Sequence, residues 1–245
     1  MLRSLKRKIW NLMISKIMGT ITHVSTQHSV VALTFDDGPD PQWTPLLLDI
    51  LDSYQARATF FMIGDCARTQ PGLVRQVAEA GHVIGNHSWN HSSFPLISSR
   101  ERREQVSACA DAISPYGVRL FRPPYGNQSL VSWIDLKLCR YEVVTWNVHA
   151  YDWENRDAYW MADRLESQVR PGSIILLHDA ICDQRYLSRK PMLDAVKIFL
   201  EHVGNRFSFI TLPELFQYGH IKKEKWCMEP DIDWLNSHKR QDYEE

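Results

Sequence analysis

The sequence has few of the features that mark disulfide-rich, zinc-thiolate or nucleic-acid-binding proteins. Its five cysteines are widely spaced and include no C-x-x-C pair, which argues against a zinc-thiolate site and a disulfide framework. We expect most of them to be buried thiols, and this usage favours a reducing compartment. With 28 basic and 29 acidic side chains, the chain shows no basic excess of the kind that binds nucleic acid, so no nucleic-acid partner is expected.

The chain also lacks internal repeats, low-complexity segments and an apolar run long enough to cross a bilayer. Residues 1–27 have a basic start and an apolar stretch that Asn11 and Lys16 interrupt, with no clear cleavage site of a secretory signal. Residues 1–20 are expected either to lie on a membrane surface as a basic amphipathic helix, or to form a packed helix or loose leader. The cytoplasm or the cytoplasmic face of a membrane is favoured, with the cell envelope as the alternative.

Strand-like apolar runs alternate with helical patterns from residue 28 to residue 218. Such alternation predicts a parallel sheet with right-handed crossovers. Seven repeats in 245 residues favour a single-domain α/β fold, a distorted (β/α)7 barrel that is closed or incompletely closed. The fifth strand is expected as one run over 142–148. Residues 1–27 are interpreted as a leader, 28–218 as the domain and 219–245 as a polar C-terminal tail.

Five short polar clusters follow the apolar runs. If the runs are parallel strands, the clusters meet at one face, where α/β folds place their active sites. Carboxylates, histidines and an arginine gathered there can bind a metal and move protons. The clusters are Thr34–Pro39, Asn86–His91, Arg122–Gly126, Tyr151–Trp153 and Leu177–Asp179.

Two of these clusters suggest a metal site. The adjacent carboxylates Asp36 and Asp37 repel unless a cation or partner compensates one of them, so one can be a ligand and the other a base. Asp-Gly-Pro is also good turn chemistry. His87 and His91 would face the same way on a helical turn, as metal-ligand pairs do, although two surface histidines would also fit. Two histidines and one carboxylate leave an open position on zinc, and harder or redox-active divalent metals can use the same mixed set.

The aromatic and proline-rich clusters are less specific. Arg122 begins a turn in which two prolines would hold the amide of Tyr125 as a donor, or simply make a packed turn. Four tryptophans are expected in the core by default, with stacking on sugar rings as the alternative. They are Trp43, Trp89, Trp146 and Trp160.

Taken in order, the five clusters resemble the motifs of the polysaccharide deacetylases, the NodB-homology group of carbohydrate esterase family 4. The resemblance covers about residues 30–216. One position departs from it: the family often reads D-x-x-D-W, and His149 stands where the first acid would be. We expect His149 to be a surface histidine, with a sugar contact as the alternative. The matching motifs are T-F-D-D-G-P at Thr34–Pro39, H-[ST]-x-x-H at His87–His91, R-x-x-Y at Arg122–Tyr125, D-W at Asp152–Trp153 and L-x-H at Leu176–His178.

The resemblance implies a role for each matching residue. The divalent metal, most simply Zn²⁺ with Co²⁺, Ni²⁺ or Mn²⁺ as alternatives, would be held by Asp37, His87 and His91. The proton-transfer groups would be Asp36 as base, oriented by Arg122, and His178 as acid, tuned by Asp152. The groups around the substrate would be the backbone N–H of Tyr125 in an oxyanion hole, and Trp153 and Leu176 as walls for the acetyl methyl group.

The resemblance also implies a reaction and a partner. The expected activity is metal-dependent removal of N-acetyl groups from an amino-sugar polymer or oligomer: a chitooligosaccharide, peptidoglycan or an exopolysaccharide. The expected partner is therefore an N-acetylated glycan. The alternatives are an O-deacetylase of the acetylxylan type that uses the same residues, and a non-catalytic carbohydrate-binding protein.

Overall fold

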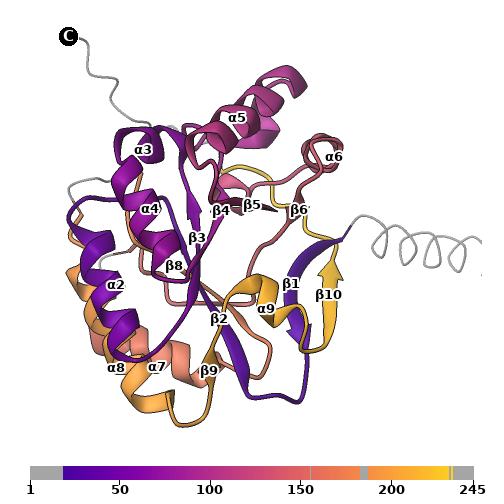
Figure 1. The fold of residues 1–245 in the computed structure, drawn as a ribbon. Coiled ribbons are helices and arrows are strands. Elements are labelled where there is room, and N and C mark those ends of the chain that lie inside the picture. Colours follow the sequence, from indigo (N-terminus) through magenta and orange to yellow (C-terminus); the bar gives the residue numbers. More distant parts are fainter. Residues whose placement is uncertain (1–18, 155, 183–186, 232, 234–245) are drawn as a thin grey trace, which may run out of the picture.

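A parallel sheet forms the centre of the molecule in this computed structural model, which describes residues 19–154, 156–182, 187–231 and 233 (Figure 1). The short strand β9 (Ser208–Phe209) pairs in parallel with the start of β2. The edge strands β6 and β7 are not joined to each other, so the sheet is an open half-barrel and the predicted incompletely closed (β/α)7 fold is confirmed. In spatial order its strands are β6 (Glu142–Val143), β5 (Gly117–Phe121), β4 (Val83–Asn86), β3 (Ala58–Met62), β2 (Val30–Asp36), β8 (Ile174–His178) and β7 (Val148–His149).

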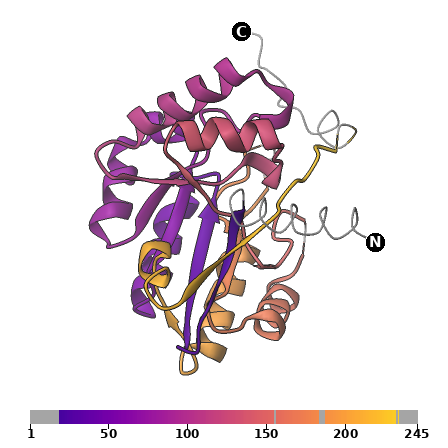
Figure 2. The same cartoon turned by 90° about the vertical axis from the view of Figure 1, so that its right-hand side faces the viewer.

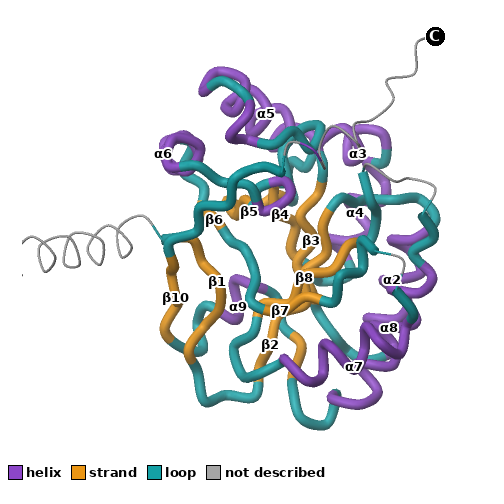
Figure 3. Tube along the Cα trace, turned by 180° about the vertical axis from the view of Figure 1, so that it is seen from behind, coloured by secondary structure: helices purple, strands orange, loops and turns teal. Residues whose placement is uncertain are grey.

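The helices pack around this sheet, with α2, α7 and α8 on one side and α5 and α6 towards the other (Figure 3). Helix α5 begins with a capping box, since Ser98 N–H donates to Glu101 Oε2 at 2.7 Å and Ser98 Oγ accepts from Glu101 N–H at 3.3 Å. No described helix is long and apolar enough to cross a membrane. The helices are α2 (Trp43–Ser53), α3 (Gly64–Thr69), α4 (Pro71–Glu79), α5 (Ser99–Ala112), α6 (Leu130–Leu138), α7 (Ala158–Gln168), α8 (Lys190–Val203) and α9 (Leu212–Leu215).

Strand β2 lies in the middle of the sheet and is buried along its whole length. Leu33 and Phe35 pack into the larger apolar cluster with Phe199 of α8, whereas Ala32 points into a second cluster with Ile210. A strand covered on both faces reads as a continuous apolar run, which is why this segment has no polar alternation. Its carboxyl end is therefore fixed in position from both sides.

A two-stranded antiparallel ribbon lies beside the opening of the half-barrel (Figure 2). It consists of β1 (Thr20–Ser25) and β10 (His220–Glu224). The carbonyl of Ile21 accepts from Thr145 N–H at 2.8 Å, which attaches β1 to the chain beyond β6. The two segments predicted to be leader and tail thus each contribute one strand. Residues 1–18 and 234–245, which include most of the proposed membrane-contact segment, lie outside the described residues.

The single strand predicted over 142–148 is wrong: the chain makes β6, leaves the sheet and returns as β7 on the far side of β8. The reason lies in the intervening carbonyls. Val144 O and Thr145 O accept from the guanidinium of Arg122 at 3.4 and 3.0 Å. Both carbonyls thus accept from a buried arginine, while the N–H groups of Val144 and Thr145 donate to Phe121 O of β5 and Ile21 O of β1.

Candidate active and metal site

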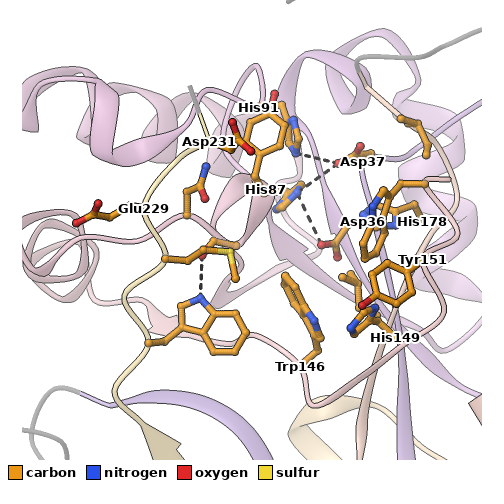
Figure 4. A pocket seen from close by; sticks show the side chains of 18 residues that line it. Asp36, Asp37, His87, His91, Trp146, His149, Tyr151, His178, Glu229 and Asp231 are labelled. Carbon is orange, nitrogen blue, oxygen red and sulfur yellow. Dashed lines mark hydrogen bonds and ion pairs between the residues drawn. The ribbon is translucent and has the colours of Figure 1, made fainter. Parts of the chain in front are cut away.

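The parallel register brings the predicted clusters to one edge of the sheet. Asp36 pairs with His178 across β2 and β8, and Asn86, the residue before His87, pairs with Phe121, the residue before Arg122. A cavity of about 520 Å³ opens at this edge (Figure 4). The predicted site residues that line it are Asp36, Asp37, His87, His91, Tyr125, Trp153, Leu176 and His178, while Arg122 and Asp152 lie behind them.

Asp37, His87 and His91 form a buried group with their ligand atoms within 4.8 Å of one another. Asp37 Oδ1 lies 3.3 Å from His87 Nε2 and 3.2 Å from His91 Nε2. His87 Nδ1 lies 2.8 Å from the carbonyl of Arg122. Because a carbonyl can only accept, Nδ1 carries the proton of neutral His87, and Nε2 turns its lone pair towards Asp37.

The chemistry of this group fits a divalent cation. Asp37 Oδ2 accepts from Cys182 N–H at 3.0 Å, but Oδ1 is buried without a hydrogen-bond donor. Burial alone would raise the pKa of Asp37, yet the charges that His91 and His178 carry when protonated hold it well below its usual range. A buried carboxylate oxygen without a donor is costly, and a cation between it and the two imidazole nitrogens would satisfy it.

The histidine pair lies on a loop, so the predicted helical turn is wrong. Ser88 has a φ of 67° and His91 a φ of 63°, both in the left-handed region. The loop is held by side chains: Ser88 Oγ accepts from His91 N–H at 3.0 Å, and Gln105 Oε1 accepts from Trp89 N–H at 2.9 Å. This loop still brings the two rings to a centroid separation of 5.0 Å.

Asp36 is positioned by a completely buried arginine. Arg122 Nη1 donates to Asp36 Oδ1 at 2.8 Å and to Thr34 Oγ1 at 2.7 Å. Asp36 Oδ2, the other oxygen, lies 3.8 Å from His87 Nε2, on the side of the metal-binding group. The guanidinium therefore fixes one carboxylate oxygen and leaves the second one facing the cavity.

His178 and Asp152 form a second buried pair of ionisable groups at this edge. His178 Nδ1 lies 3.0 Å from Asp152 Oδ1, and Asp152 Oδ2 accepts from His178 N–H at 2.8 Å. Burial alone would lower the pKa of His178, but the charge and hydrogen bond of Asp152, followed by the charges of Asp37 and Asp36, raise it to about 8. At neutral pH the ring is therefore mostly a cation that can donate a proton.

Arg189 contacts both residues of this pair, and no motif in the sequence predicts that contact. Its Nη1 donates to the carbonyl of Asp152 at 2.8 Å, its Nη2 to Asp152 Oδ2, and its Nε to the carbonyl of His178 at 3.1 Å. A lone arginine outside every motif does not reveal such a role. It gives Asp152 Oδ2 a second donor beside His178 N–H and satisfies the backbone carbonyl of Asp152.

Aromatic side chains make up much of the cavity wall. The ring centroids of Tyr125 and His91 lie 4.3 Å apart, and those of Trp153 and His178 lie 5.5 Å apart. The backbone of Tyr125 has a φ of 58°. His149 is half-buried against Trp153 in the cavity wall and is not the expected open-surface histidine. Trp146 both packs on the core and lines the cavity, whereas the expected core residue Trp160 is exposed.

A stretch of the polar tail also lines the cavity, which the sequence analysis did not predict. The residues concerned are Trp226, Met228, Glu229 and Asp231. In the sequence, the apolar residues of this charged tail, Trp226 among them, are the feature that could have indicated a packed segment.

Comparison with known proteins connects this geometry to a family. Residues 23–144 match the family model described as "Polysaccharide deacetylase". A peptidoglycan-N-acetylglucosamine deacetylase of Bacillus cereus is 36% identical over 202 residues, which cover 80% of this chain and 92% of the relative. A chitooligosaccharide deacetylase of Azorhizobium caulinodans is 36% identical over 167 residues, covering 66% of this chain and 80% of the relative.

A solved structure shows the same architecture. The Bc1960 peptidoglycan N-acetylglucosamine deacetylase, crystallised with an N-hydroxybenzamide compound, superposes with a TM-score of 0.75 at 29% identity. The match covers 82% of this chain and 94% of that one.

Proposed function

This chain belongs to the polysaccharide deacetylase family of amide-hydrolysing enzymes, and from this premise we propose that it removes N-acetyl groups from an amino-sugar polymer or oligomer with the help of a bound divalent cation. The observation that carries the proposal is the buried group of Asp37, His87 and His91 beside Asp36 and His178 in one cavity. Two relatives named as deacetylases of peptidoglycan N-acetylglucosamine and of chitooligosaccharides support an N-acetylated glycan as substrate.

The cation would be held by Asp37 Oδ1 and the Nε2 atoms of His87 and His91. When bound, a divalent cation of the zinc type acidifies a coordinated water and polarises a carbonyl. Asp37 brings one negative charge and the two imidazoles bring none, so the group leaves a net positive charge for these tasks. The Arg122 carbonyl, by fixing the His87 tautomer, keeps a ligand nitrogen directed at the site.

Asp36 would be the general base. Its Oδ1 is bound by Arg122, so Oδ2 is the oxygen that can take a proton from the attacking water. Because the guanidinium is completely buried and donates to four acceptors, it holds the carboxylate in one orientation. A base of this kind typically contributes on the order of 10²–10⁴ in rate.

His178 would be the general acid. Its Nδ1 is engaged by Asp152, so Nε2 is the nitrogen that can give a proton to the leaving amine. The raised pKa of about 8 keeps this proton in place at neutral pH. The backbone N–H of Tyr125 would stabilise the oxyanion, and Trp153 and Leu176 would enclose the acetyl methyl group.

Acetate release from N-acetylchitotetraose and from peptidoglycan, with measurement of bound metal, tests this proposal. We expect activity to be lost on chelation and restored by Zn²⁺ or Co²⁺. The variant Asp36→Asn should keep its metal and lose about 10²–10⁴ of kcat. The control Asp49→Asn changes an exposed acid on α2 and should act like the wild type. Full activity without metal, or in Asp36→Asn, contradicts the proposal, and release from acetylated xylan alone would point to an O-deacetylase.

A further inference from the structure

Helix α6 presents an exposed apolar side, here called the α6 face. Single exposed apolar side chains are normal on a protein surface, but here four large ones belong to one helix of nine residues. Spacings of three, four and seven residues place them on the same side of the helix. The opposite side packs into the molecule through Ser132, Asp135 and Leu136. The α6 face consists of Leu130, Val131, Ile134 and Leu138, of which Leu138 is 70% exposed.

The α6 face has no partner among the described residues. Helix α6 lies at the edge of the molecule, beyond β6, and packs on α5 and β6 (Figure 1). The buried side of the helix makes this packing, so the apolar side faces solvent. A contiguous exposed apolar patch marks a surface that binds a protein or a membrane. The surrounding charges favour one of these two partners.

The charged side chains around the end of α6 are in basic excess. Arg119 and Arg140 are exposed, and neither pairs with an acid among the described residues. The guanidinium of Arg119 lies 5.1 Å from the ring centroid of Tyr141, the residue after Arg140. Two acids lie near the helix end, and each of them is already paired with two cations. Glu142 pairs with Lys137 and Lys223, and Asp135 pairs with Arg102 and Arg103.

The first described strand begins beside the α6 face. Gln128 Nε2 donates to Thr20 Oγ1 at 2.8 Å, and Gln128 lies just before Leu130 in the chain. Residues 1–18 therefore join the fold next to α6. Their sequence combines apolar side chains with basic ones and contains no acid, a composition that binds anionic membrane surfaces. The basic residues are Arg3, Lys6, Arg7, Lys8 and Lys16.

We propose that the α6 face docks on a membrane surface that contains anionic lipids, with residues 1–18 bound to the same surface. The apolar side chains enter the boundary between headgroups and acyl chains, and Arg119 and Arg140 contact lipid phosphates. Because residues 1–18 and the surroundings of α6 are both basic, charge complementarity favours a shared anionic partner over packing of the segment on α6. Helix α6 follows the Tyr125 turn, so docking holds the cavity near the membrane. The inference does not depend on the proposed reaction.

Flotation with lipid vesicles tests the apolar part of the proposal. The vesicles contain phosphatidylcholine with about 30% phosphatidylglycerol, or phosphatidylcholine alone. In the full-length chain, Val131→Gln/Leu138→Gln changes the two most exposed members of the α6 face to a good helix former. We expect this double variant to lower the partition coefficient on anionic vesicles by about tenfold or more. The matched control Leu46→Gln changes an apolar residue of α2 that is 46% exposed and should partition like the wild type.

A charge variant tests the choice of an anionic surface. Arg140→Gln should lower the partition coefficient by about fivefold, since each cation near an anionic surface contributes about that factor. Its control Lys197→Gln changes an exposed cation of α8 and should partition like the wild type. Wild-type binding should weaken on phosphatidylcholine alone and at high salt, which screens this attraction.

Two further measurements keep the outcomes separate. Thermal melts check that each variant is folded, and acetate release from N-acetylchitotetraose in solution should be the same in the α6 variants as in the wild type. Failure of the wild type to float with anionic vesicles would overturn the inference and leave the proposed reaction untouched. Equal flotation of the wild type and Val131→Gln/Leu138→Gln would also overturn it. A dimer in gel filtration that this double variant abolishes, without vesicle binding, would replace the membrane by a second copy of the chain.

Discussion

Replacing Asp152 by asparagine should move the alkaline limit of activity by more than one pH unit. In the wild type the pKa of His178 is raised from 6.5 to about 8, against the lowering effect of burial, mainly by the charge and hydrogen bond of Asp152. This difference corresponds to about 2 kcal/mol in favour of the protonated ring. Asparagine keeps the shape of the side chain but supplies no charge. Burial would then dominate, and the pKa of His178 should fall below 6.5.

The sign of the effect follows from the role of His178. A general acid is active while protonated, so wild-type activity should fall as the pH rises through about 8. At pH 7.5 a ring with that pKa is about three-quarters protonated, whereas a ring with the ordinary value is only about one-tenth protonated. The smaller protonated fraction of His178 alone therefore predicts that the activity at pH 7.5 falls by about eightfold or more. The raised pKa also stabilises the fold: this contribution is complete below about pH 6.5 and is lost as the pH rises through about 8.

The assay is the pH profile of kcat/KM on N-acetylchitotetraose from pH 5.5 to 10, together with an NMR titration of the His178 ring. The control Asp163→Asn changes an exposed acid on α7 and should keep the wild-type profile. Thermal melts show whether the variant is folded at the assay temperature, because Arg189 loses its buried partner in Asp152→Asn. An unchanged alkaline limit in a folded Asp152→Asn protein would refute the assignment of that limit to a His178–Asp152 pair.

Two further substitutions test the packing behind the site. Gly38→Ala places a Cβ 2.3 Å from Asp179 Oδ2 and should lower the free energy of unfolding by about 1–3 kcal/mol, measured by urea denaturation. Its control is Gly72→Ala, where a Cβ meets nothing within 4 Å, and this variant should not destabilise the protein. Arg189→Met leaves Asp152 buried without its guanidinium and should cost about 3–5 kcal/mol in the same assay, so an unchanged urea midpoint would contradict the structural role given to this arginine.

The site could be predicted because its residues follow buried strands directly. Asp36 and His178 stand at the last positions of β2 and β8, and these two strands are recognisable as continuous apolar runs. Once the strands are known to be parallel, their ends must share an edge. The polar residues at that edge then collect in one place without any knowledge of the loops.

Other parts of the structure depend on interactions that leave no local pattern. Strands β1 and β10 are almost two hundred residues apart, and β10 is exposed along its length, so it has no apolar alternation. The split of the predicted fifth strand depends on Arg122, a residue outside that segment, which captures its carbonyls. The left-handed backbone of His91 is set by contacts of its loop with Ser88 and α5.

The open half-barrel separates the strand ends that carry the candidate site from one wall of its cavity. The group of Asp37, His87 and His91 and the proposed base and acid, Asp36 and His178, are positioned by β2, β4, β5 and β8, which pair directly with one another or through β3. Residues 226–231, in contrast, join this edge through hydrogen bonds to the Tyr125 turn and follow the ribbon in the chain. A change in Trp226 can therefore alter the cavity wall without moving Asp37, His87, His91 or His178. Exchanging residues 226–231 should therefore change which glycan is preferred while the metal content and the pH profile stay the same.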